Sequence, residues 1–178
     1  MKAFITLLIV SFMFQNDTLV ISDFKNEIGM TNWYVVDDGV MGGLSQGDLN
    51  LNNAKNLLYT GTVRTENNGG FSSIRHNFEV VDVSNFKTIK VVLKGDGKSY
   101  QFRIKDNRSQ RFSYIKVFET TGEWETVEIP LDQFYPSYRG YTLDKPNYSG
   151  SVMEEIAILI GNKTKESFEL EIEKIYVE

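Results

Sequence analysis

The fold class is decided by residues 86–105, which read FKTIKVVLKGDGKSYQFRIK. Two runs of strand-forming residues, Phe86–Leu93 and Ser99–Lys105, flank the pair Asp96-Gly97. An Asp-Gly pair between two such runs is typical of a β-hairpin, because these residues accept the positive φ of a tight turn. The second run alternates, with Tyr100, Phe102 and Ile104 on one side and Gln101, Arg103 and Lys105 on the other. We therefore expect a strand with one buried face and one polar face.

The rest of the chain continues this pattern of short strands separated by turn residues. Further strands are expected over residues 57–63, 71–78, 112–118, 124–129, 153–160 and 168–173. No long segment repeats apolar residues at the helical spacing i, i+3, i+4 and i+7. About ten short strands in a chain of 178 residues predict an all-β domain, either a β-sandwich or a barrel.

The longest stretch without a strand pattern is Asp132–Gly150, which contains two prolines and five aromatic residues. Loops of this length in a compact domain are usually functional or disordered, and the aromatic residues argue against disorder. We therefore expect a functional loop that presents its tyrosines at the surface.

Composition excludes several classes of function. The net charge is −5, so there is no basic excess to displace the counterions of a nucleic acid. The chain has no cysteine and a single histidine, which excludes thiol catalysis, cysteine zinc sites and multi-histidine metal sites. We expect no cofactor and no bound metal.

The amino terminus resembles an export signal. Lys2 is followed by the apolar run Ala3–Phe14, whose twelve residues are too few for a transmembrane helix. We expect residues 1–16 to be a signal peptide and residues 17–178 to be a single domain, exported to the periplasm or envelope. The alternatives are a buried first strand or a wrongly assigned start, and the protein would then be cytoplasmic.

A glycine-rich segment at residues 33–47 reads WYVVDDGVMGGLSQG and holds four glycines within nine positions. Such density predicts positive φ angles or close backbone approach. One interpretation is a ligand or partner loop in which Asp37 and Asp38 hold calcium. The other is a tight corner whose aspartates cap backbone amides, and we favour it because no EF-hand spacing is present.

Hydrolytic chemistry finds little support. His76 shares the predicted apolar strand face with Ile74 and Phe78, so we expect a packed, hydrogen-bonded residue rather than a catalytic base. No Gly-x-Ser-x-Gly elbow is present. Carboxylates for glycosidase chemistry exist, but nothing in the sequence places two of them across a cleft.

Aromatic and arginine residues offer binding interpretations. Aromatic rings can stack on sugars or anchor a protein partner, and we expect Trp33 and Trp124 to pack in the core. Four arginines either line a face that recognises carboxylates or are solvated surface residues: Arg64, Arg75, Arg103 and Arg139.

Several motifs, in order along residues 22–177, are similar to those of the complex I intermediate-associated protein 30 family. They are Trp33 with Asp37–Ser45 (DDGVMGGLS), Glu66–Arg75 (ENNGGFSSIR), Lys94–Tyr100 (KGDGKSY), Trp124–Pro130, Phe134 with Arg139-Gly140, and Ile156–Gly161 with Phe168–Ile175. The resemblance implies a galactose-binding-domain-like jelly-roll β-sandwich. Mitochondrial members assist assembly of NADH:ubiquinone oxidoreductase without known catalysis, so it also implies respiratory complex I subunits or assembly intermediates as partners.

Three functions remain to be separated. The first is a non-enzymatic, chaperone-like binding module for a protein partner, the second a carbohydrate-binding module of the cell envelope, and the third an enzyme. The binding candidates lie in four segments: Trp33, Asp37, Asp38, Gly39, Met41, Gly42, Gly43 and Ser45; Asn67, Asn68, Gly69 and Gly70; Arg75; and Tyr138, Arg139 and Gly140.

Overall fold

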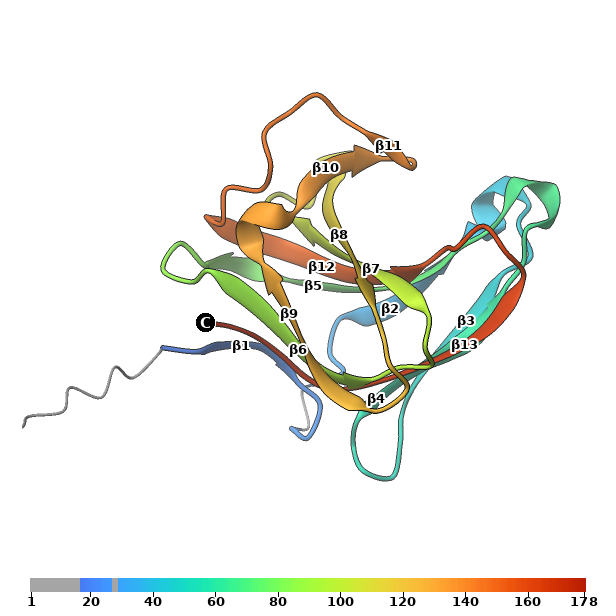
Figure 1. The fold of residues 1–178 in the computed structure, drawn as a ribbon, viewed down its shortest axis with the longest axis horizontal. Coiled ribbons are helices and arrows are strands. Elements are labelled where there is room, and N and C mark those ends of the chain that lie inside the picture. Colours follow the sequence, from blue (N-terminus) through green and yellow to red (C-terminus); the bar gives the residue numbers. More distant parts are fainter. Residues whose placement is uncertain (1–16, 27–28) are drawn as a thin grey trace, which may run out of the picture.

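Two antiparallel sheets form the molecule in the computed structural model, which describes residues 17–26 and 29–178 (Figure 1). The expected signal peptide at residues 1–16 lies outside the described residues. Within the described ranges, none of the helices is long and apolar enough to cross a bilayer.

The first sheet has the strand order β3-β4-β13-β6-β9, with β1 also paired to β13. Its strands are β1 (Leu19–Asp23), β3 (Gln46–Leu51), β4 (Leu57–Val63), β6 (Thr88–Lys94), β9 (Trp124–Pro130) and β13 (Glu166–Val177). The long β13 pairs with three partners because β1 and β6 meet its second half while β4 pairs with its first half.

The second sheet has the order β11-β10-β8-β7-β12-β5-β2. Its strands are β2 (Trp33–Asp37), β5 (Ser72–Asp82), β7 (Ser99–Lys105), β8 (Ser113–Glu119), β10 (Tyr135–Tyr138), β11 (Tyr141–Thr142) and β12 (Val152–Ile160). Figure 1 shows β8 rising to β10 and β11, which stand over β12 and β5. Three short 3₁₀ turns complete the described fold: η1 (Asp38–Met41), η2 (Glu66–Asn68) and η3 (Leu131–Gln133).

The inward faces of the sheets form one apolar core. Tyr100, Phe102 and Ile104 of β7 are at most 1% exposed, which confirms the alternation expected for this strand. Their neighbours across the ladder, Ile156 and Ile158 of β12, are fully buried as well. The jelly-roll β-sandwich implied by the family resemblance is confirmed. The hairpin expected at Asp96-Gly97 is wrong, because β6 belongs to the first sheet and β7 to the second, and this turn carries the chain from one sheet to the other.

The Asp132–Gly150 segment is more ordered than expected. It contains η3, β10 and β11, so its description as an irregular loop is wrong. Tyr141 is 77% exposed, as expected of a surface tyrosine, but Tyr148 is buried and its hydroxyl donates to the carbonyl of Val152 at 2.7 Å. The β10 strand escaped the sequence pattern because it is only four residues long and contains a proline.

The two tryptophans differ. Trp33 is 8% exposed and packs in the core, as expected. Trp124 is 46% exposed, so its assignment to the core is wrong. It begins β9, where it lies opposite Lys94 at an end of the first sheet.

Candidate binding groove

The glycine-rich corner is organised around the carboxylate of Asp38. Asp38 is 5% exposed and accepts hydrogen bonds from Ser45 N at 3.1 Å, Ser45 Oγ at 2.6 Å, Gly70 N at 2.6 Å and Phe71 N at 3.2 Å. A Cβ atom at Gly43 would lie 2.2 Å from Asp38 Oδ1, so the backbone can approach only without a side chain there. Burial alone would raise the pKa of Asp38, but the hydrogen bonds from Ser45, Gly70 and Phe71 outweigh it and lower the pKa.

The neighbouring residues extend this structural corner. Asp37 Oδ2 accepts from Gly47 N at 3.0 Å, and Asn67 Nδ2 donates to the carbonyl of Gly42 at 3.0 Å. Asn67 and Asn68 have φ angles of 56° and 60°, which suit asparagine in a tight turn. The remaining candidates of the corner are backbone elements: Gly39 and Met41 in η1, Gly42 as its left-handed end, and Gly69 as the end of η2. The aspartate oxygens are thus occupied by protein donors.

A groove of about 430 Å³ is hollowed into the outward face of the second sheet. Side chains of β5, β7 and β12 line it, together with the β10–β11 turn, the segment before β8 and the β12–β13 loop. Six of its fifteen lining residues are cationic and none is acidic: Arg75, Arg103, Lys105, Arg111, Arg139 and Lys163. A chain with a net charge of −5 therefore concentrates positive charge on one hollow.

Strand register explains how two of these arginines come together. Arg75 of β5 and Arg103 of β7 both lie opposite Ala157 of the intervening β12. All three side chains point away from the core because they alternate with buried neighbours along their strands. Ala157 is small, so both guanidinium groups have room above the sheet.

One carboxylate lies beside the groove. Glu155 of β12 is 6% exposed, and its Oε1 is 3.3 Å from Lys105 Nζ and 3.7 Å from Arg75 Nη1. Arg103 instead donates to the neutral Gln101 Oε1 from Nε at 3.2 Å and from Nη2 at 2.7 Å. Burial lowers the pKa of Arg103 to about 10, and repulsion from Arg75 adds to this effect. The groove is therefore incompletely neutralised.

The rim cations are open to solvent. Arg111, Arg139 and Lys163 are exposed, and within the described part of the chain none of them is within 4.0 Å of a carboxylate oxygen. The Arg139 guanidinium lies 5.4 Å from the ring centroid of Tyr138, a cation–π contact. Arg139 and Gly140 have φ angles of 50° and 83°, which form the tight β10–β11 turn that carries this pair.

The binding residues predicted from the sequence divide between the glycine-rich corner and the groove. Gly70, Arg75, Tyr138, Arg139 and Gly140 line the groove, whereas the rest of the glycine-rich candidates build the corner. Trp33 lies in neither, since its ring stacks on His76 inside the sandwich with centroids 4.9 Å apart.

Of the four arginines considered for carboxylate recognition, three line the groove, while Arg64 pairs with Glu66 at 2.7 Å. Lys105, Arg111 and Lys163 were missed. The alternation of β7 already placed Lys105 beside Arg103, but no sequence signal showed that this face is concave.

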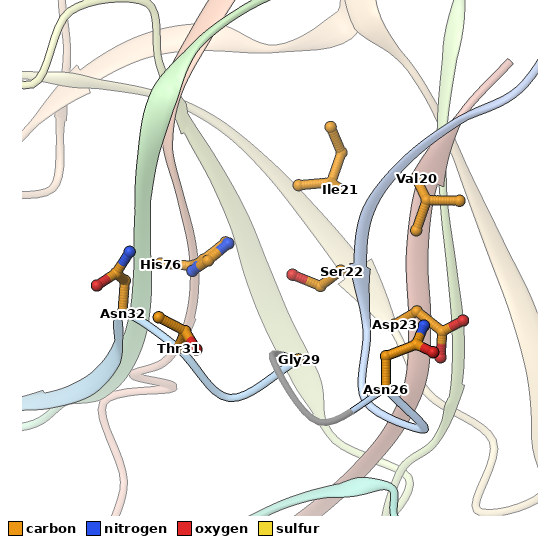
Figure 2. A pocket seen from close by; sticks show the side chains of 9 residues that line it. All are labelled: Val20, Ile21, Ser22, Asp23, Asn26, Gly29, Thr31, Asn32 and His76. Carbon is orange, nitrogen blue, oxygen red and sulfur yellow. The ribbon is translucent and has the colours of Figure 1, made fainter.

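A second hollow, of about 460 Å³, lies between β1 and the start of β2 (Figure 2). Ser22 and His76 point toward one another across it, yet Ser22 Oγ and His76 Nδ1 are buried and have no hydrogen-bond partner among the described residues. The Asp23 carboxylate accepts from Lys25 N at 3.1 Å. These three residues therefore do not form the linked hydrogen bonds of a nucleophile, base and orienting acid.

A family model described as complex I intermediate-associated protein 30 (CIA30) matches residues 22–172. The chain belongs to this family. This confirms the resemblance seen in the sequence motifs.

The CIA30 domain also resembles solved carbohydrate-binding structures. The family 11 carbohydrate-binding module of the cellulosomal cellulase Lic26A-Cel5E of Clostridium thermocellum is 16% identical, with a TM-score of 0.65 over 90% of this chain and 94% of that one. The same module type from that organism, in complex with a β-1,3-1,4-mixed-linked tetrasaccharide, is 18% identical, with a TM-score of 0.63 over the same shares. The agarase AgWH50C is 12% identical, with a TM-score of 0.63 over 90% of this chain and 24% of that one. At these identities the similarity shows the fold alone.

Proposed function

We propose that this CIA30 domain is a non-enzymatic binding module that holds a protein partner and assists assembly of NADH:ubiquinone oxidoreductase or another membrane complex. The observation that carries the proposal is the groove, which offers a preformed, charged and concave surface on a rigid sheet. Membership of the CIA30 family supports a protein as the occupant.

The test is affinity capture by the tagged protein from gently solubilised membranes of its source organism. We expect subunits of a respiratory or other membrane complex to be recovered and identified by mass spectrometry. Tyr138→Ala should weaken capture without changing Tm, because Tyr138 lies at the groove rim. Failure of the unaltered protein to recover any membrane-complex subunit would contradict the proposal.

A second candidate function is a carbohydrate-binding module of the envelope, favoured by the fold shared with the family 11 modules. Sugar-binding sites usually offer aromatic rings on which the sugar stacks. The aromatic residues of the groove lining are Phe71 and Tyr138. The Tyr138 ring also carries Arg139 on one face. A glycan array with and without calcium separates the two functions, and strong glycan binding lost on Tyr138→Ala would favour the carbohydrate function.

Export stays a prediction from the sequence of residues 1–16. If these residues act as a signal, the module works in the periplasm or envelope; otherwise it works in the cytoplasm. Mass spectrometry of the amino terminus of protein isolated from its own cells tests this, because cleavage after export would remove the apolar run Ala3–Phe14.

A further inference from the structure

The charge of the groove exceeds what its own neighbours neutralise. Six cationic residues line it, and Glu155 shares a single oxygen between Lys105 and Arg75 at 3.3 and 3.7 Å. Both separations are longer than the usual 2.7–2.9 Å of a charge-assisted hydrogen bond. Arg75 Nε is buried, and no residue of 17–26 or 29–178 accepts a hydrogen bond from it. Burying donors and like charges in this way is costly unless something else satisfies them.

The cations are arranged on two levels. Arg75 of β5 and Arg103 and Lys105 of β7 lie on the two strands that flank β12, and they form the floor. Arg111, Arg139 and Lys163 belong to three separate connections around the groove and form the exposed rim. A single small anion can satisfy the floor, and the exposed rim cations are placed to meet further negative charges carried on the same ligand.

We propose that the groove binds an extended segment of the partner protein that carries several aspartate or glutamate side chains. One carboxylate enters the floor between Arg75 and Arg103, whose guanidinium groups suit paired hydrogen bonds to carboxylate oxygens. The following carboxylates meet the rim cations. That the occupant is a protein rests on the proposed function. That it is acidic follows from charge complementarity with the cationic groove.

A substitution at Glu155 should strengthen binding, whereas most substitutions in a binding site weaken it. Its carboxylate competes with the ligand for Arg75 and Lys105. Glu155→Gln removes that competition, so it should tighten binding of an acidic segment by about threefold. A variant that merely disturbed the fold would weaken binding instead.

The experiment measures binding of fluorescein-labelled hexaglutamate to the purified protein by fluorescence anisotropy, with hexalysine and hexagalacturonate as comparison ligands. We expect hexaglutamate to bind, hexalysine not to bind, and the affinity to fall between about 50 and 300 mM salt. Replacing Arg111, Arg139 and Lys163 together by glutamine should weaken binding about tenfold. The matched control removes three positive charges far from the groove, with glutamine at the exposed Lys55, Lys87 and Lys94 in the β3–β4 turn, before β6 and at the end of β6, and it should leave binding unchanged.

Three results would overturn the proposal: no binding of hexaglutamate, equal binding by the rim variant, or tighter binding of hexagalacturonate, which would make the ligand an acidic glycan. Membrane capture with the same variants separates this inference from the proposed function. Capture that survives in the rim variant contradicts the inference and leaves the function standing. Hexaglutamate binding without capture of any membrane subunit contradicts the function and leaves the groove chemistry standing.

Discussion

Replacing Asp38 by alanine should lower the free energy of unfolding by about 4 kcal/mol. The side chain is 5% exposed and accepts from three backbone amides and one hydroxyl, at 2.6–3.2 Å. Each hydrogen bond to a charged group contributes about 1.5–3 kcal/mol, and water can reach part of this surface corner to replace some of them. Asp38→Asn keeps one acceptor oxygen and should lose about 2 kcal/mol.

Urea unfolding followed by tryptophan fluorescence measures these losses, with an unchanged dependence on urea as the sign that the folded state is otherwise intact. Asp48→Asn is the matched control, because Asp48 is exposed and, among the residues that the structure describes, accepts a hydrogen bond from Asn50 alone. It should change stability by less than about 0.5 kcal/mol. A loss below about 1 kcal/mol for Asp38→Ala would refute the assignment of Asp38 as the centre of the corner.

A substitution at Gly43 tests independently whether Asp38 is the centre of the glycine-rich corner. Gly43→Ala would place a Cβ atom 2.2 Å from Asp38 Oδ1, so it should be destabilising on its own. It should cost much less in the Asp38→Gly background, where both the carboxylate and the Asp38 Cβ atom, 2.8 Å from the added Cβ, are gone. Equal costs in the two backgrounds would show that the clash is not with Asp38.

The pH dependence follows from the lowered pKa of Asp38. A carboxyl group whose pKa is lower in the folded state adds stability above its unfolded pKa of about 3.9, and that stability is lost as pH falls through the folded pKa. The stability difference between the unaltered protein and Asp38→Asn should therefore be constant near pH 7 and shrink below about pH 4.

Two other positions give simpler predictions. Burial lowers the pKa of His76, so the free energy of unfolding should decline as pH falls below about 6.5. His76→Phe should flatten this decline in unfolding curves measured from pH 7 to 5. An equally steep decline in the variant would exclude His76 as its cause. Tyr148→Phe should lower the free energy of unfolding by about 1 kcal/mol, because it removes the hydrogen bond to Val152 O. Tyr141→Phe, at the exposed β11, should have no measurable effect. Equal effects of the two substitutions would contradict the assigned role of Tyr148.

Local sequence pattern was sufficient to locate most strands but not to pair them. β7 spans the expected Ser99–Lys105, yet the expected hairpin with β6 is wrong, because β6 pairs with β9 and β13 whereas β7 pairs with β8 and β12. The turn residues Asp96-Gly97 mark a reversal of the chain, but tertiary packing decides which strands pair. The β3 strand was not expected, since half of its six residues are Gly47, Asp48 and Asn50, types that are rare in strands. Its Gly47 lies where a Cβ atom would come within 2.3 Å of Ser72 Oγ, a tertiary constraint that no local pattern records.

The binding groove, too, could be predicted only in part, because local pattern does not record which distant residues meet. Motif similarity drew attention to Arg75 and to Arg139, which lie far apart in sequence and meet at the groove. The motifs gave equal weight to the Asp38 corner, whose aspartates hold backbone amides instead of facing an open ligand site. Lys163 could not be found from sequence, because only the curvature of the second sheet brings the β12–β13 loop to the groove rim.

The most direct measurement of the central claim, that the groove is the partner-binding surface, is photo-crosslinking in intact membranes. A photoreactive amino acid at Ser113, which lines the groove, is compared with one at Thr126, exposed on β9 of the other sheet. We expect Ser113 to crosslink a subunit of a membrane complex through a segment rich in aspartate or glutamate, and Thr126 to yield no such product. Crosslinks to membrane-complex subunits from Thr126 and none from Ser113 would contradict the claim.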